Sequence, residues 1–144
     1  MKPDFTGVWK LIRGESEFGF LPPPRLRVDT ISHLEPEFRV RTRQKDANGD
    51  LTVDRDLVLG RAPIAVTIRG RVRLVRAFWD DSVLVVETVS EVSGKPRRLV
   101  DRRTLDADNG WMTIERLQEQ PGGPVRQKLR LRRSGDIHDA MVSG

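Results

Sequence analysis

The sequence predicts a single all-β domain, an antiparallel up-and-down barrel of about eight to ten strands. Three observations support this prediction. Apolar and polar residues alternate in many segments, turn-forming residues recur at intervals of roughly ten to fifteen residues, and no segment has the pattern of a long helix. Strands in such an order leave the fewest exposed edges when the sheet closes on itself. We therefore prefer a barrel to its structural alternative, a sandwich of two sheets.

Alternation is clearest at residues 38–43, where Phe38, Val40 and Thr42 are separated by arginines. Successive side chains of a strand point to opposite faces, so this segment has one apolar and one solvated face. Residues 51–59 and 124–133 alternate in the same way, whereas residues 83–86 are apolar on both faces. We expect strands at residues 4–13, 25–34, 37–46, 51–59, 64–69, 71–79, 83–91, 97–106, 111–119 and 124–133.

Turn signals separate these strands. Asn48-Gly49 and Asn109-Gly110 supply the positive φ angles that tight hairpins need, and Asp80-Asp81, Ser93-Gly94 and residues 121–124 mark further turns. Three consecutive prolines at residues 22–24 block one candidate helix. The turns therefore divide the chain into short strands joined in sequence order.

The chain has 144 residues, the length of one domain. We place that domain at residues 1–133 and expect a polar tail at residues 134–144, with a helical turn at 137–141. The absence of cysteine excludes disulfides, thiolate metal sites and cysteine nucleophiles. No segment approaches the roughly 18 apolar residues of a membrane span, and the first residues lack the apolar core of a signal peptide. The expected location is the cytoplasm unless a signal has been removed, and the sequence is compatible with a monomer or a dimer.

The formal charge of +5 raises nucleic acid or an anionic surface as a partner. The 26 lysines and arginines are, however, interleaved with 21 acidic residues, and many occupy alternate strand positions. A solvated outer sheet face accounts for that distribution, so nucleic acid is not the favoured partner.

Gly7-Val8-Trp9 in the first expected strand matches the G-x-W motif of the calycins, which include lipocalins and fatty-acid-binding proteins. In calycins this tryptophan closes one end of the barrel, and a basic side chain of the last strand packs over it. The resemblance implies the same arrangement here, with Arg130 or Arg132 as the cation.

More of the chain, from residue 5 to about 133, resembles a group of uncharacterised bacterial lipocalin-like proteins. The matching motifs are Gly7-Val8-Trp9-Lys10-Leu11, Ser16-Glu17-Phe18-Gly19 and the prolines at residues 22–24, followed by similar stretches at residues 79–88, 104–110 and 127–129. Asp81-Ser82 departs from the Gly-Asp often expected after Trp-Asp, and the chain is richer in arginine than expected. The resemblance implies a lipocalin-like barrel and suggests ligand binding, but it transfers no activity.

If the more apolar face of each strand points into the barrel, the interior is an apolar chamber that also contains polar groups. Its expected apolar residues are Trp9, Leu11, Leu26, Val28, Phe38, Val40, Leu57, Leu74, Phe78, Leu84, Val86, Met112, Ile114, Leu129 and Leu131. Its expected polar residues are Thr30, Thr42, Gln44, Arg55, Arg76, Thr88, Arg116 and Gln127. An isolated charge inside a barrel is costly, so an inward arginine implies a carboxylate partner, water or a bound anion.

Arg55, Arg76 and Arg116 are the arginines of this expected interior. If two or three of them meet inside, they can hold the carboxylate of an amphipathic ligand, because a guanidinium binds a carboxylate through two parallel hydrogen bonds. A shift of register by one residue would instead turn them to solvent. The residues we expect to bind ligand are Trp9, Phe20, Phe38, Val40, Arg55, Leu74, Arg76, Phe78, Val86, Thr88, Met112, Arg116 and Gln127.

Residues 15–24 form a long apolar connection in which Phe18, Phe20 and Leu21 have two interpretations. They form a lid over the open end of the barrel, or they cap the core beneath the loop.

Catalytic signals are weak. The only histidines, His33 and His138, lack a second ligand at metal-binding spacing, and no serine lies in a G-x-S-x-G elbow. Glu87 and Glu115 are candidate acid–base groups if they are buried. No cofactor or metal site is predicted. The leading hypothesis is a barrel that binds a small hydrophobic or amphipathic molecule; the alternatives are a cofactor-free isomerase, cyclase or hydrolase using the same cavity, and binding of nucleic acid or an anionic surface.

Overall fold

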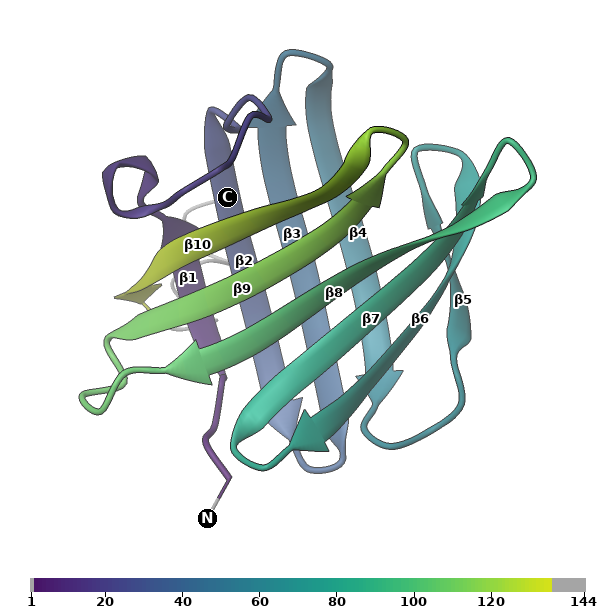
Figure 1. Cartoon of the computed structure of the whole chain (residues 1–144). Coiled ribbons are helices and arrows are strands. Elements are labelled where there is room, and N and C mark those ends of the chain that lie inside the picture. The colour runs from purple at the N-terminus through teal and green to yellow at the C-terminus, as the bar shows by residue number, and fades with distance from the viewer. Residues whose placement is uncertain (1, 136–144) are drawn as a thin grey trace.

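The computed structural model describes residues 2–135, which form one sheet of ten antiparallel strands (Figure 1). The strands are β1 (Gly7–Leu11), β2 (Leu26–Leu34), β3 (Glu37–Asp46), β4 (Gly49–Val58), β5 (Ile64–Ile68), β6 (Arg71–Asp80), β7 (Val83–Val92), β8 (Lys95–Leu105), β9 (Trp111–Gln120) and β10 (Gly123–Gly135). Within residues 2–135 the only helical turn is the 3₁₀ segment Arg13–Glu15. The ten strands agree with those expected from alternation, whereas the expected helical turn at 137–141 lies outside the described residues.

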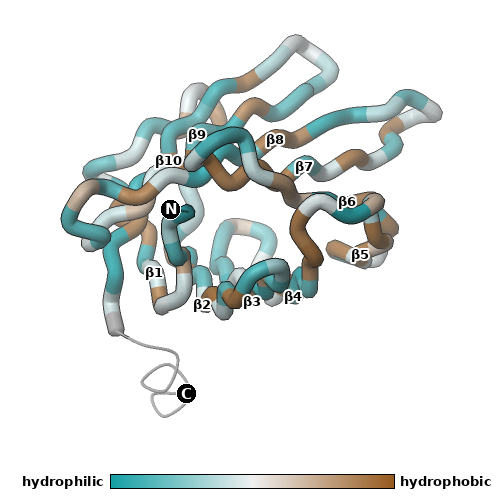
Figure 2. The backbone as a smooth tube through the Cα atoms, turned by 90° about the horizontal axis from the view of Figure 1, so that it is seen from below, coloured by the Kyte–Doolittle hydropathy of each residue, from teal (hydrophilic) through white to brown (hydrophobic). Residues whose placement is uncertain are grey.

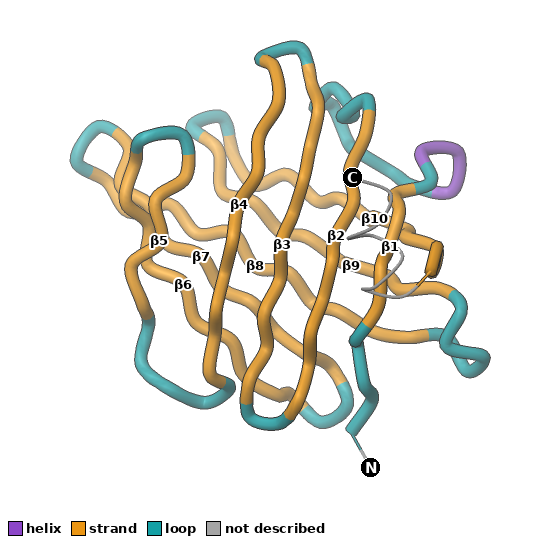
Figure 3. The backbone as a smooth tube through the Cα atoms, turned by 180° about the vertical axis from the view of Figure 1, so that it is seen from behind, coloured by secondary structure: helices purple, strands orange, loops and turns teal. Residues whose placement is uncertain are grey.

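The sheet curls into a nearly closed barrel. Its strand order is β4-β3-β2-β1-β10-β9-β8-β7-β6-β5, so β1 and β10, the first and last strands, pair with each other. Figure 2 shows the ring end-on, with β2–β4 on one side and β8–β10 on the other, and Figure 3 shows β2–β4 from behind. The sheet ends at β4 and β5, and the Gly60 N–H donates a hydrogen bond to the Ala77 carbonyl of β6, 2.9 Å away. The predicted up-and-down barrel is confirmed, and the sandwich is not formed.

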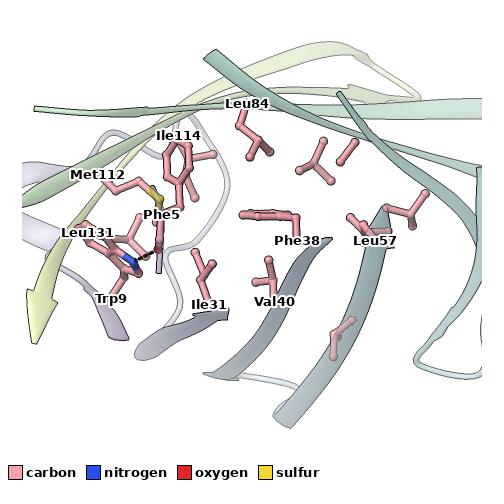
Figure 4. Packing of buried hydrophobic residues seen from close by; sticks show 14 of the residues in the cluster. Phe5, Trp9, Ile31, Phe38, Val40, Leu57, Leu84, Met112, Ile114 and Leu131 are labelled. Carbon is pink, nitrogen blue, oxygen red and sulfur yellow. Dashed lines mark hydrogen bonds between the residues drawn. The ribbon is translucent and has the colours of Figure 1, made fainter. Parts of the chain in front are cut away.

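The interior has an apolar half and a polar half. On β3, Phe38 and Val40 are followed inward by Thr42 and Gln44, and on β9 the inward Ile114 is followed by Arg116. In the apolar half, side chains from β1–β4 meet those from β7–β10, as Figure 4 shows for Phe5, Trp9, Ile31, Phe38, Leu57, Leu84, Met112, Ile114 and Leu131. All of these are at most 3% exposed, so this half is solidly packed.

Trp9 closes the apolar end. Its indole N–H donates to the Phe5 carbonyl at 2.9 Å, and the guanidinium of Arg133 lies 4.4 Å from its ring centroid. Arg133 also donates to the Thr6 carbonyl at 2.6 Å. A Cβ atom on Gly7, whose φ is +149°, would lie 2.5 Å from Nη1 of Arg133. The glycine of the motif thus leaves room for the cation that covers the tryptophan.

The expectation that Arg130 or Arg132 covers Trp9 is wrong. Both lie over Trp111 instead, at 4.9 and 5.7 Å from its centroid. The β1–β10 ladder is irregular between Val8 and Trp9, and beyond that irregularity Trp9 pairs with Arg133. The additional residue, Ser134, lies in the last strand, and the alternation of that strand does not reveal it.

The buried face of β2 is the opposite of the face that we expected to be buried. Its inward residues are Arg27, Asp29, Ile31 and His33, so the inward placement of Leu26, Val28 and Thr30 is wrong. Both faces of this strand contain apolar residues, so alternation alone could not assign the buried face. The structure buries the charged alternative because Arg27 and Asp29 pair with each other.

No helix in the described part of the chain has the length and apolarity needed to cross a membrane.

Candidate ligand-binding cavity

The polar half of the barrel encloses a cavity of about 290 Å³. Thirteen polar residues line it: Arg27, Thr42, Gln44, Asp46, Asn48, Arg55, Arg69, Arg73, Thr88, Asp101, Arg103, Arg116 and Gln118. Five apolar residues complete the wall: Leu51, Val53, Ile68, Val86 and Leu99. The β3–β4 and β5–β6 hairpins supply Asn48 and Arg69, so the cavity reaches the end of the barrel opposite Trp9.

Asp29 anchors one ion cluster at the inner end of this cavity. Nε and Nη2 of Arg27 donate to its two carboxylate oxygens at 3.1 and 3.2 Å, and Nη1 of Arg103 donates at 3.0 Å. Burial alone would raise the pKa of Asp29, but the charges of Arg27 and Arg103 outweigh it and hold this pKa far below its usual range. Asp29 is therefore ionised and bound by two arginines.

A second pair lies on neighbouring strands, where Arg116 of β9 is directly opposite Asp101 of β8. Nε and Nη2 of Arg116 donate to the two oxygens of Asp101 at 2.8 and 2.9 Å. Burial would raise the pKa of Asp101, but the charge and hydrogen bonds of Arg116 lower it below the usual range. Asp101 is thus ionised, and it neutralises Arg116.

Arg55 has no carboxylate partner among the described residues. Its Nη1 donates to the hydroxyl oxygen of Thr42 at 3.3 Å, and Thr42 in turn donates to Asp29 at 3.0 Å. The buried Nε of Arg55 has no hydrogen-bond partner. Burial, followed by the charge of Arg27, lowers the pKa of Arg55 to about 10, so it keeps its charge at neutral pH. It is the cation best placed to accept an anion.

Two further arginines lie at the mouth of the cavity. Nη2 of Arg69 contacts a carboxylate oxygen of Asp46 at 3.2 Å. Arg73 forms no ion pair within residues 2–135, and its buried Nε has no partner. Burial lowers the pKa of Arg73 first, and the charges of Arg71 and Arg69 lower it further.

Positive charge exceeds negative charge in this half of the barrel. Six lining arginines face three carboxylates, those of Asp29, Asp46 and Asp101, which leaves an excess of three positive charges. Uncompensated charge in a partly buried site is costly. The cavity is therefore suited to an anion.

The structure brings four of the expected ligand-binding residues together on the cavity wall: Arg55, Val86, Thr88 and Arg116. Four others, Trp9, Phe38, Val40 and Met112, are inward as expected but fill the packed apolar half. Gln127 faces inward and donates from its side-chain nitrogen to the Phe18 carbonyl at 2.9 Å, which holds the loop that follows β1.

Leu74, Arg76 and Phe78 are on the outer face of β6, so their expected inward placement is wrong. Arg73, Val75 and Ala77 face inward instead. Both faces of this strand contain apolar residues, and Arg76 stacks over Phe78 at 4.9 Å on the outside, which shields part of the ring. Arg76 therefore cannot take part in an internal anion site.

In the loop of residues 15–24, one of the two aromatic residues caps the core and the other forms no lid over the cavity. Phe18 packs against the core, as a cap would, whereas Phe20 is 77% exposed and does not line the cavity. The expectation that Phe20 lines the cavity is therefore wrong.

Arg27, Asp29, Asp101 and Arg103 are the important cavity residues that sequence reasoning missed. In each pair an acid and an arginine are two positions apart, so they share a face of their strand. That spacing, which places an acid and an arginine on one face of a strand, was the available signal for a buried ion cluster.

The candidate acid–base residues lie elsewhere. Glu87 is on the outer face, hydrogen-bonded by Arg76 and Arg98, and Glu115 is exposed. Nδ1 of His33 accepts the Phe5 N–H at 3.2 Å, and its Nε2 lies 2.8 Å from an oxygen of Glu35, so both ring nitrogens have structural partners. Residues 2–135 contain no group of three metal-ligating side chains, and His138 lies outside the described residues.

No family model matches the chain, and no curated protein matches its sequence. The REP1-NXSQ fatty acid transporter is 14% identical, with a TM-score of 0.66 over 91% of this chain and 96% of that one. A secretory abundant heat soluble protein from Ramazzottius varieornatus is 13% identical, with a TM-score of 0.69 over 90% and 94%. Zebrafish ileal bile acid-binding protein, complexed with cholic acid, is 12% identical, with a TM-score of 0.63 over 90% and 98%. These similarities show the fold, and the predicted calycin-type barrel is confirmed.

Proposed function

We propose that this protein binds a small amphipathic molecule that carries a carboxylate or another anionic group. The observation that carries the proposal is Arg55, a charged guanidinium with an unpartnered Nε that faces a cavity with excess positive charge. An anion there would form charge-assisted hydrogen bonds in a partly dehydrated site, where such bonds are strong.

The other ionised groups prepare the site for the anion. Arg27 and Arg116 are fixed by their carboxylate partners, so they lose little freedom when a ligand enters. Thr88 and Gln118 add hydrogen-bonding groups to the wall. Leu51, Val53 and Ile68 provide an apolar surface for the rest of the molecule.

The dimensions favour a compact ligand. A volume of about 290 Å³ lies at the lower limit of small-molecule sites, which span about 300–1,000 Å³. The apolar half is occupied by side chains such as Phe38, Leu84 and Ile114, which are completely buried against their neighbours. Two similar structures are named for a fatty acid and a bile acid, both amphipathic acids, which supports this ligand class.

We also propose kinship with the bacterial lipocalin-like group whose motifs the chain carries. The S-[DE]-F-G motif has a structural role here. The hydroxyl of Ser16 accepts the Arg130 N–H at 2.9 Å and donates to the Ile12 carbonyl at 2.8 Å. At Gly19, φ is +63° and a Cβ would lie 3.2 Å from a methyl carbon of Val125. The motif thus docks the loop on β10.

Calorimetric titration with cyclohexanecarboxylate tests the proposed function. We expect saturable binding at one site, lost in Arg55→Met. Arg76→Met, which removes an arginine from the outer face, is the matched control and should bind normally. Equal affinity of the parent protein and Arg55→Met would contradict the proposal.

A further inference from the structure

The cavity has two centres of positive charge, which different strands supply. The inner one is Arg55 of β4, which is joined to the Asp29 cluster of Arg27 and Arg103 through the hydroxyl of Thr42, and the charges of these two arginines lower its pKa. The outer one is Arg73 on β6, whose pKa is lowered by burial and then by Arg71 and Arg69. The charges that act on Arg73 come from its own hairpin, whereas those that act on Arg55 come from β2 and β8.

Among the residues that line the cavity, each centre has one arginine without a carboxylate partner within residues 2–135. In the inner centre, Arg27 and Arg103 bind Asp29, whereas Arg55 binds no carboxylate and, like Arg103, has an unpartnered Nε. In the outer centre, Arg69 binds Asp46, while Arg73 has a buried, unpartnered Nε and no ion pair within the described chain. Both spare guanidinium groups line the same cavity.

We propose that the ligand carries two anionic groups, one bound at Arg55 and the other at Arg73, joined by a short apolar spacer. This inference rests on the proposed anion-binding function. One negative charge leaves most of the cavity's excess of three positive charges uncompensated, whereas a dianion compensates a second centre. Val53, Ile68 and Val86 on the same wall suit a hydrocarbon spacer. A compact dicarboxylate has this chemistry.

Pairs of acids that differ only by one carboxylate distinguish a cavity with one anion site from a cavity with two. Octanoate and octanedioate have the same number of carbon atoms and differ by one carboxylate, as do hexanoate and hexanedioate. We expect at least one dicarboxylate to bind about tenfold more tightly than its monocarboxylate partner, because it forms a second charge-assisted contact. Titration calorimetry at neutral pH and fixed ionic strength measures all four affinities.

Arg73→Gln tests the outer centre. This variant should bind the dicarboxylate about tenfold more weakly, while its affinity for the monocarboxylate stays unchanged. Arg71→Gln is the matched control: Arg71 is on the same hairpin but is exposed and does not line the cavity. It should retain the preference for the dicarboxylate. Circular dichroism and thermal unfolding establish that each variant is folded.

Three results would overturn the inference in distinguishable ways. Equal affinity for both acids of each pair would exclude a second anion site but leave the proposed function intact. Equal losses in Arg71→Gln and Arg73→Gln would show a general effect of charge at the mouth rather than a specific contact. Failure of all four acids to bind would overturn the proposed function and this inference with it.

Discussion

Arg116 and Asp101 face each other across β8 and β9, and Nε and Nη2 of the arginine bind the two carboxylate oxygens at 2.8 and 2.9 Å. Asp101 is 5% exposed. A close copy of this pair lies on the outer surface, where Arg41 and Asp54 bind through the same atoms at 2.7 and 3.2 Å. The barrel therefore contains the same interaction in a buried and an exposed setting.

Asp101→Asn should lower the free energy of unfolding by about 3–5 kcal/mol, because it leaves Arg116 charged and largely buried without its partner. Asp54→Asn, the exposed counterpart, should cost about 0–1 kcal/mol. Urea denaturation followed by circular dichroism measures both values. Similar losses for the two substitutions would show that Asp101 does not compensate a buried charge.

Arg55→Met should stabilise the ligand-free protein by about 1–3 kcal/mol, since it replaces a buried charge that has no carboxylate partner by an apolar chain of similar length. The same variant should lose anion binding. A higher thermal unfolding midpoint together with lost binding would show that stability is sacrificed for function at this position. A lower midpoint would indicate that Arg55 is required to hold Thr42 and Asp29 in place.

Stability should fall as the solution becomes acidic. The pKa values of Asp29 and Asp101 are lower in the folded protein than their ordinary value of 3.8. Their contribution to the free energy of unfolding is therefore complete above the unfolded pKa and is lost as the pH falls below about 4 towards the lower folded pKa. Urea denaturation at pH 7, 5 and 3 should show a steep loss only in the last interval, and that loss should be smaller in Asp29→Asn.

Gly7→Ala should destabilise the protein by about 1–3 kcal/mol, because an L residue is strained at this φ and the new methyl group would displace Arg133 from Trp9. Gly14→Ala is the matched control, since a Cβ there meets no atom within 4 Å. Thermal unfolding of the two variants makes the comparison. Equal midpoints would remove the steric explanation of the G-x-W glycine.

The strand positions were predictable because the hydrophobic period of two and the Asn-Gly turns are local signals. Which face of β2 and β6 is buried could not be predicted, because apolar residues occur on both faces of each strand and packing across the barrel selects the buried face. In β3 one face is apolar, and in β4 the only apolar residue of the outer face is Val58 at the end of the strand, so Phe38, Val40 and Leu57 were assigned correctly.

The same distinction separates the arginines whose inward placement was correct from the one whose inward placement was wrong. Arg55 and Arg116 were placed inside by strict alternation, whereas Arg76 was placed inside by the ambiguous pattern of β6. The partner of Arg116 could not be identified in advance, because the register between β8 and β9 determines that Asp101 is opposite it. Charge pairing between strands depends on tertiary structure that a single sequence does not display.

Because β1 pairs with β10, the barrel can close only when both strands have been made. Hairpins from β2 to β9 join neighbouring segments and can fold as they leave the ribosome, but the seam needs both the first and the last strand. Until the last strand emerges, the nascent sheet remains open and its inward arginines are hydrated. The energetic cost of removing water from them therefore falls on the step in which β10 joins β1.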